Sequence, residues 1–583
     1  MINKATKLLI VCLLVSCIVG CSRKDEEKSN FSANIDKCYQ ENGVDEIMTM
    51  SGNSKQDLKD LSDTMHSMYG ENLEITDEYD KNLSIKTDNG TYVGKIVSDD
   101  VISWKGIPYA KQPVGDLRWR APQEPDASDS VYEAYYFGHS PLQAIGNNEP
   151  ASLYPQGEDC LNLNIWNNTL DASSNKPIMV WIYGGAYVQG GASTDIYDGT
   201  GFVLNHPDVI YVSIDYRTDF MGFINLSNVE GAEDYTDSAN LGLLDQMQAI
   251  KWLKQNAKAF GGDPDRITIF GESAGAGSVS ALTLAPQAKG LFKRAIMQSG
   301  IASGFLRSKE KSIEHTNKIM EITGAKNIDD LLSLSESDIR KLENIFHYAL
   351  TNYTIYPQCD DIVIPVDIKE ALKSNRRNGI DIMVGTNKDE YNFWTMVLGQ
   401  EANMVAMQKS EESMLEKMDD DQKTRYKEFM DMQDGDEYNK LLQSINYLGF
   451  HSPTRNEANT HIANGQNAYV YYFTEESTDL LASHCYDLGF VLGNVEVDRV
   501  KDLDSAKRLS AIMQQMWVNF AINGDPSLLD GQVEDIGSIK WNTYEPDNYP
   551  VMIFDSLNVR QESDPIKNQN DLIEDLYWLR IDN

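Results

Sequence analysis

Short apolar runs alternate with longer helical stretches from about residue 84 onward. The runs are rich in β-branched and aromatic residues and carry few polar ones, which is typical of strands buried on both faces. Helical stretches such as residues 243–259 and 274–284 separate them. We therefore expect an α/β fold, a large and mainly parallel sheet with helices on both faces, in one domain over residues 84–583. The predicted strands are residues 178–183, 209–214, 267–270, 295–297, 380–384 and 468–473.

The first twenty residues have the pattern of a secretion signal. Lys4 and Lys7 precede an apolar run over residues 8–20, which is too short to span a bilayer comfortably as a helix. The run ends at Cys21 and the chain then turns polar, which resembles the lipobox of bacterial lipoproteins, in which the cysteine is diacylated. Cys17 also fits the pattern, but it would leave two apolar residues on the aqueous side. A cleaved signal whose cysteines are incidental is the remaining alternative.

This pattern predicts the organisation of the N-terminal part of the chain. We expect residues 1–20 to be a signal peptide and residues 21–83 to be a lipid tether and N-terminal extension. Within them, residues 22 to about 35 are polar and predict the tether, and residues 55–70 predict one amphipathic helix. The protein is then expected to be exported and anchored to the bacterial cell envelope through Cys21.

Charge and cysteine spacing narrow the choice of partners. The net charge of -38 would repel nucleic acid, so no nucleic-acid partner is expected. Cys38, Cys160, Cys359 and Cys485 match no metal-binding spacing, and their pairing stays open. The sequence leaves the oligomeric state undetermined.

A nucleophile motif follows the predicted strand 267–270. Residues 271–275 read Gly-Glu-Ser-Ala-Gly, a G-x-S-x-G pattern between a strand and a helix. In that setting the serine sits on a tight turn, and the glycines let strand and helix approach closely. The helix N-terminus behind it favours developing negative charge. Ser273 is therefore the predicted nucleophile of an acyl-transfer enzyme.

A serine nucleophile needs a base, an orienting acid and donors for the oxyanion. In hydrolases with this motif the acid and then the histidine follow the serine in the chain. His484 lies eleven residues beyond the strand 468–473 and is the best-placed histidine. Asp389 and Glu390 both follow the strand 380–384, and the pattern does not separate them. The glycine-rich residues 184–186 after an early strand are candidates for the oxyanion donors.

Longer blocks around these residues resemble the type-B carboxylesterase family, which includes the cholinesterases. The resemblance runs from about residue 85 to about 556 and implies the α/β-hydrolase fold. Its ordered blocks are Trp104-Lys105-Gly106-Ile107-Pro108-Tyr109-Ala110, Glu158-Asp159-Cys160-Leu161-Asn162-Leu163, Asn240-Leu241-Gly242-Leu243-Leu244-Asp245, Phe270-Gly271-Glu272-Ser273-Ala274-Gly275, Gln298-Ser299-Gly300 and Asn387-Lys388-Asp389-Glu390.

The resemblance implies a role for each candidate residue. It assigns a catalytic triad of Ser273, Glu390 and His484, and an oxyanion hole made by the N–H groups of Gly185, Ala186 and Ala274. Ser299 is expected to support the acid through a hydrogen bond to Glu390. Arg118 and Glu158 match a structural ion pair, and Cys160 is expected to be a free thiol. The implied reaction is hydrolysis of a small-molecule ester, with no metal and no cofactor.

Two features limit the substrate and the function. Cholinesterases carry a tryptophan that holds the choline cation by cation–π contact, and residues 147–154 have none, so choline esters are not expected as dedicated substrates. The alternative function is a catalytically silent surface binding lipoprotein, since some relatives use the fold for adhesion. Those relatives lack part of the triad, whereas this chain has all three members. The natural ester stays open.

Overall fold

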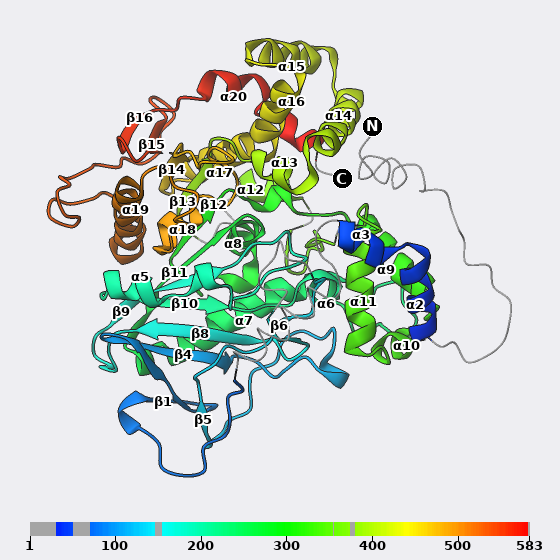
Figure 1. Ribbon diagram of the computed structural model, residues 1–583, viewed down its shortest axis with the longest axis vertical. Helices are drawn as coiled ribbons and strands as arrows, with labels where there is room; N and C mark the ends of the chain where they lie inside the picture. Colours follow the sequence, from blue (N-terminus) through cyan, green and yellow to red (C-terminus); the bar gives the residue numbers. More distant parts are fainter. Residues whose placement is uncertain are drawn as a thin grey trace.

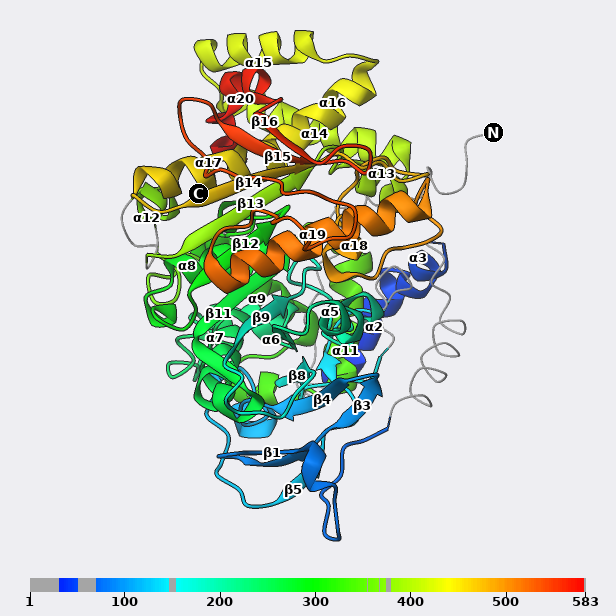
Figure 2. The same ribbon diagram turned by 90° about the vertical axis from the view of Figure 1, so that its left-hand side faces the viewer.

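A single twisted sheet carries the elements that position the site (Figures 1 and 2). The structure is a computed structural model, in which residues 31–50, 70–145, 154–353, 355–365, 367–373 and 379–580 are described. Within them, the largest sheet has eleven strands. In spatial order these are β16 (Arg560–Ser563), β15 (Pro550–Phe554), β14 (Ala468–Phe473), β13 (Asp381–Asn387), β12 (Arg294–Gln298), β11 (Gly262–Glu272), β9 (Lys176–Ile182), β10 (Ile210–Ile214), β8 (Asn162–Asn167), β4 (Val101–Pro108) and β3 (Lys95–Ser98).

All six predicted strands are present, as β9 to β14. Neighbours from β10 to β15 pair in parallel, which confirms the mainly parallel sheet. The outer strands β8, β4 and β3 on one side and β16 on the other pair antiparallel. The parallel strands are almost completely buried because helices cover both of their faces.

The two faces of the sheet are covered by different helices, as Figure 1 shows. The predicted helix 274–284 coincides with α8, and the prediction 243–259 corresponds to α7 and the 3₁₀ turn Ala257–Phe260 that follows it. One face carries α7 (Leu241–Asn256), α8 (Ala274–Leu284) and α17 (Ser452–Ala463), and the other carries α5 (Thr200–Asn205), α18 (Leu488–Leu492) and α19 (Leu503–Asn523).

Two helical insertions follow β12 and β13, whose carboxyl ends reach the site. The insertion after β12 consists of α9 (Lys309–Thr323), α10 (Ile328–Leu332), α11 (Glu336–Tyr348) and α12 (Ile368–Lys373). The insertion after β13 begins with α13 (Asn392–Leu398), α14 (Gln400–Lys417), α15 (Asp420–Met432) and α16 (Glu437–Asn446), and α20 (Lys567–Ile573) packs on α15. A separate small sheet joins β1 (Ser84–Thr87), β2 (Gly90–Val93) and β5 (Val131–Glu133).

The N-terminal extension is folded from residue 31. Helix α2 (Phe31–Glu41) packs on α9 and α11, and α3 (Val44–Met50) follows it (Figure 1). Ile35 is fully buried in this contact, and Asn34 Nδ2 donates to the Thr323 carbonyl at 2.8 Å. Residues 31–35, predicted as the end of a tether, are therefore helical. Cys21, Cys17 and residues 51–69 of the predicted helix lie outside the described residues.

No helix in the described ranges has both the length and the hydrophobicity needed to cross a membrane. This finding covers neither the predicted signal nor Cys21.

The predicted ion pair is confirmed, and it joins the sheet domain to the first insertion. Arg118 Nε donates to Glu158 Oε2 at 2.7 Å, and both side chains are buried. Arg118 Nη1 also donates to the carbonyl of Leu334 at 2.7 Å, in the turn after α10. Among the described cysteines, Cys160 is a buried free thiol, as expected, and Cys359 and Cys485 are also free thiols.

Candidate active site

Ser273 occupies a strained turn between β11 and α8. Its backbone has φ 55° and ψ −124°, a conformation that a residue with a side chain rarely adopts. Its N–H donates to the Gln298 carbonyl at 2.9 Å, so the turn is held to the next strand. A Cβ at Gly275 would lie 2.1 Å from the Ile182 carbonyl oxygen, which excludes larger residues there. The turn thus leaves the Ser273 side chain partly exposed at the carboxyl end of the sheet.

The glycine-rich loop after β9 runs beside Ser273. A Cβ at Gly184 would lie 3.0 Å from Ser273 Cβ. Gly185 and Ala186 both have positive φ, 109° and 55°, and no hydrogen bond of the described residues uses their N–H groups. The N–H of Ala274 begins α8, where it has no intrahelical acceptor. The three predicted oxyanion donors are therefore available around the nucleophile.

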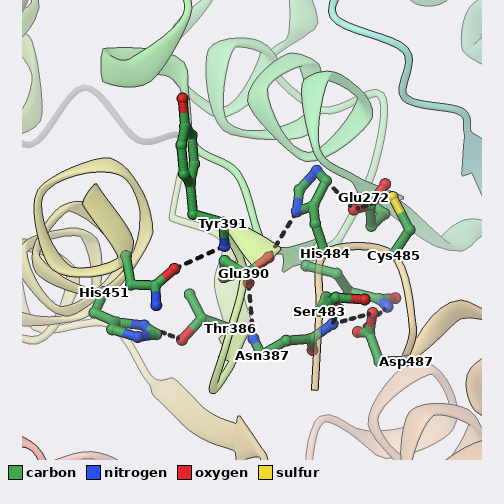
Figure 3. A network of polar contacts seen from close by, with 12 residues as sticks. Glu272, Thr386, Asn387, Glu390, Tyr391, His451, Ser483, His484, Cys485 and Asp487 are labelled. Carbon is green, nitrogen blue, oxygen red and sulfur yellow. Dashed lines mark hydrogen bonds and ion pairs between the residues drawn. The ribbon is translucent and has the colours of Figure 1, made fainter. Parts of the chain in front are cut away.

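His484 is held by Glu390 (Figure 3). The imidazole Nδ1 lies 2.6 Å from Glu390 Oε2, and the His484 N–H donates to the Glu390 carbonyl at 3.1 Å. Glu390 Oε1 accepts from the N–H of Asn387 at 2.7 Å, so both carboxylate oxygens are satisfied. Asp389, which the pattern left equivalent, points elsewhere and accepts from the N–H of Ala482. The structure thus pairs His484 with Glu390.

The other ring nitrogen of His484 faces an acid that sequence reasoning missed. His484 Nε2 lies 3.2 Å from Glu272 Oε1, and the thiol of Cys485 donates to the same oxygen at 3.1 Å (Figure 3). Among the described residues no hydrogen bond joins Ser273 Oγ to His484 Nε2. The only signal for Glu272 was its place inside the G-x-S-x-G motif, at a position that the pattern treats as variable.

Burial and the two glutamates set the charge of the histidine. Burial alone would lower the pKa of His484, but the carboxylates of Glu272 and Glu390 outweigh it and raise the pKa to about 9. Burial raises the pKa of Glu272 to about 7, against the opposing effect of the imidazole charge. The two carboxylates therefore favour the imidazolium form of His484.

The chain is similar to known proteins over most of its length. A model of the carboxylesterase family matches residues 81–572, which is most of the chain. The chain belongs to this family. The para-nitrobenzyl esterase of Bacillus subtilis is 33% identical over 508 residues, which cover 82% of this chain and 96% of that protein. Carboxylesterase 1E of Mus musculus is 30% identical over 495 residues, covering 76% and 86%.

Solved structures of other proteins share the fold of this chain. The carboxylesterase EST55 of Geobacillus stearothermophilus superposes with a TM-score of 0.73 at 33% identity, covering 84% of this chain and 99% of that one. The predicted α/β-hydrolase fold is therefore confirmed, and the protein is a serine carboxylesterase.

Further buried polar groups of this carboxylesterase fix the loop that carries His484. Asp487 accepts from Gln298 Nε2 at 2.9 Å, from the Tyr471 hydroxyl at 3.1 Å and from Asn387 Nδ2 at 3.2 Å. Asn387 Nδ2 also donates to the Ser483 carbonyl at 2.8 Å. This network ties β12, β13 and β14 to the residues on both sides of His484. Figure 3 shows Asn387, Ser483 and Asp487 of this network. Sequence reasoning missed Asp487 and Asn387, because their contacts join distant segments.

The predicted hydrogen bond from Ser299 to Glu390 is wrong. Ser299 Oγ is buried and makes no hydrogen bond among the described residues. Its backbone has φ 54° and its N–H donates to the Gly385 carbonyl at 2.9 Å. The N–H of Asn387 fills the place beside the carboxylate that the hydroxyl was expected to take.

Aromatic side chains from the second insertion surround the imidazole. The ring centroids of Trp394 and Phe450 lie 5.1 Å from that of His484, and Phe393 lies at 6.1 Å. All three are partly exposed. They provide an apolar surface beside the group that would exchange protons with a substrate.

Proposed function

We propose that this carboxylesterase hydrolyses carboxylic esters through a covalent acyl-enzyme on Ser273. The observation that carries the proposal is the strained turn of Ser273, whose preceding residue Glu272 contacts a histidine that Glu390 already orients. Ser273 attacks the ester carbonyl while His484 takes the hydroxyl proton. The imidazolium then gives this proton to the departing alcohol, and water repeats the sequence on the acyl-enzyme.

Glu390 and Glu272 have different parts in this cycle. Glu390 holds Nδ1 in its protonated tautomer and stabilises the imidazolium that forms. Glu272 stabilises the same cation from the Nε2 side, since its Oε1 lies 3.2 Å away. The N–H groups of Gly185, Ala186 and Ala274 hold the oxyanion, and one such donor contributes about 3 kcal/mol to the transition state.

We propose uncharged esters with an apolar or aromatic group as the substrate class. Trp394, Phe450 and Phe393 offer an apolar wall beside His484. One similar protein is named a para-nitrobenzyl esterase, and that name contains an aromatic group. A panel of para-nitrophenyl esters of increasing acyl length, compared with a choline ester, tests this class. A preference for the choline ester would contradict it.

Covalent labelling tests the nucleophile. A fluorophosphonate probe is expected to label the wild-type protein and to leave Ser273→Ala unlabelled. Ser299→Ala, which removes the neighbouring buried hydroxyl, is the matched control and should still be labelled. A wild-type protein that resists the probe would contradict the mechanism and favour the silent binding function.

We further propose that the protein is exported and held on the cell envelope by a lipid on Cys21. The support is the basic and apolar pattern of residues 1–20 and the abrupt polar stretch after Cys21. Palmitate incorporation in cells should be abolished by Cys21→Ala and kept by Cys17→Ala. Incorporation that survives Cys21→Ala, or unlipidated mature protein, would contradict the anchor.

A further inference from the structure

The side chains of Glu272, His484 and Cys485 bring three potential metal-ligand atoms close together. Glu272 Oε1, His484 Nε2 and Cys485 Sγ all lie within 4.8 Å of one another (Figure 3). Glu272 Oε1 is the common neighbour, 3.2 Å from the nitrogen and 3.1 Å from the sulfur. Carboxylate, imidazole and thiolate are the three ligand types that zinc uses in proteins.

The spacing of these atoms is close to that of a tetrahedral zinc site. Bond lengths of about 2.0 to 2.3 Å give ligand-to-ligand distances of about 3.3 to 3.6 Å in a tetrahedron. The two measured edges at Glu272 Oε1 fall within about 0.5 Å of this range. A small outward shift of the glutamate and a closer approach of Sγ to Nε2 would complete the three-ligand face.

The surroundings hold this face in place. Glu390 fixes the ring orientation through Nδ1, which is how outer-shell carboxylates orient metal-bound histidines. Glu272, Glu390 and Asp487 place three acids around one imidazole, so a divalent cation balances charge there. Cys485 is the one partly exposed member of the three, whereas Glu272 and His484 are buried.

We propose that Glu272, His484 and Cys485 form an inhibitory binding site for Zn²⁺. The Cys485 thiol proton leaves to solvent, and sulfur, nitrogen and oxygen each donate an electron pair to the ion, with water as the fourth ligand. Its effect on activity rests on the proposed function of His484, because a zinc-bound Nε2 cannot accept the Ser273 proton. Binding itself is independent of that function. Because the ion occupies the nitrogen that takes this proton, it acts as a reversible inhibitor.

Cobalt spectroscopy tests the binding site without any activity measurement. Titration of the purified chain with Co²⁺ should produce a thiolate-to-cobalt charge-transfer band in the near ultraviolet. Cys485→Ala should abolish this band, and Glu272→Gln should weaken cobalt binding by at least about tenfold, because even loss of an outer-shell partner costs about 10- to 100-fold. Cys359→Ala, which removes a partly exposed thiol elsewhere, should keep the band. Absence of the band in wild type, or its persistence in Cys485→Ala, would overturn the proposal.

Zinc inhibition of ester hydrolysis tests the predicted effect of the bound ion on activity. Ester hydrolysis by the wild type and by Cys359→Ala should be inhibited by Zn²⁺ and restored by a chelator. In Cys485→Ala, the ratio of activity with zinc to activity with chelator should rise, with an inhibition constant at least about tenfold weaker. Inhibition that Cys485→Ala leaves unchanged would overturn the inhibitory role. A wild type with a cobalt band but no hydrolysis would overturn the proposed function and leave the binding site standing.

Discussion

Glu390 and Asp389 are adjacent acids with opposite orientations. Glu390 contacts His484 Nδ1 at 2.6 Å, whereas Asp389 accepts from a backbone N–H of the neighbouring loop. Glu390→Gln would favour the wrong imidazole tautomer, so we expect kcat to fall by about 10⁴-fold with little change in KM. Steady-state kinetics of Glu390→Gln, with Asp389→Asn as the control, checks this prediction. A loss in Asp389→Asn equal to that in Glu390→Gln would contradict the assignment.

Glu272 makes the charge of His484 depend on a second carboxylate. A negative charge at 3.2 Å favours the imidazolium, so neutralising it lowers the pKa of His484 from about 9. The base must be neutral to accept a proton, and Glu272→Gln should therefore move the rising limb of the kcat/KM profile to lower pH. The control is Glu562→Gln on the edge strand β16. A limb that stays in place or moves to higher pH would contradict this role.

At the residue scale, part of the candidate site could be predicted from the sequence. Ser273 and His484 were predictable because a local motif and chain order mark them, and resemblance separated Glu390 from Asp389. Glu272, Asp487 and the thiol of Cys485 were not, because each acts through a contact between segments far apart in the chain. For Ser299, the sequence predicted a contact that the structure does not contain. A residue matched by position was given a hydrogen bond that a backbone N–H makes instead.

The element that sets the geometry is the junction of β9, β11 and α8. Gly275 lets α8 pass so close to β9 that a Cβ would meet the Ile182 carbonyl at 2.1 Å. We expect Gly275→Ala to shift the helix, lower Tm by several degrees and reduce kcat/KM at least about tenfold, since small misplacements of reacting groups are costly. Gly304→Ala, where nothing lies within 4 Å of the new Cβ, is the control. Equal behaviour of both variants would contradict this account.

The same elements show which parts of the fold a pattern can predict. The parallel strands β9 to β14 were found because burial on both faces makes them continuous apolar runs. The outer strands β3, β4 and β16 were not predicted, since they are short or partly exposed and their pattern is mixed. The strands β8 and β15 were not predicted either, although both are buried. The arrangement of the two helical insertions was not predicted. Their helices pack on one another and on neighbouring elements, and local sequence periodicity does not determine such contacts.

On the scale of the whole molecule, two helical insertions follow strands of the sheet. The insertion after β13 brings aromatic side chains to His484, and the insertion after β12 receives the N-terminal helix α2. Arg118 links the sheet domain to that same insertion through Leu334. The enzyme has a net charge of -38, and we propose that it is tethered at its N-terminus. A net charge far from zero favours solubility.

The central claim is that hydrolysis passes through an acyl group on Ser273, and trapping that group tests it most directly. The enzyme would be quenched in acid during turnover of para-nitrophenyl acetate, digested and examined by mass spectrometry. The account predicts one added acetyl group on the peptide that contains Ser273, absent when Ser273→Ala is treated in the same way. Turnover without acylation of that peptide, or acetyl confined to another residue, would contradict it.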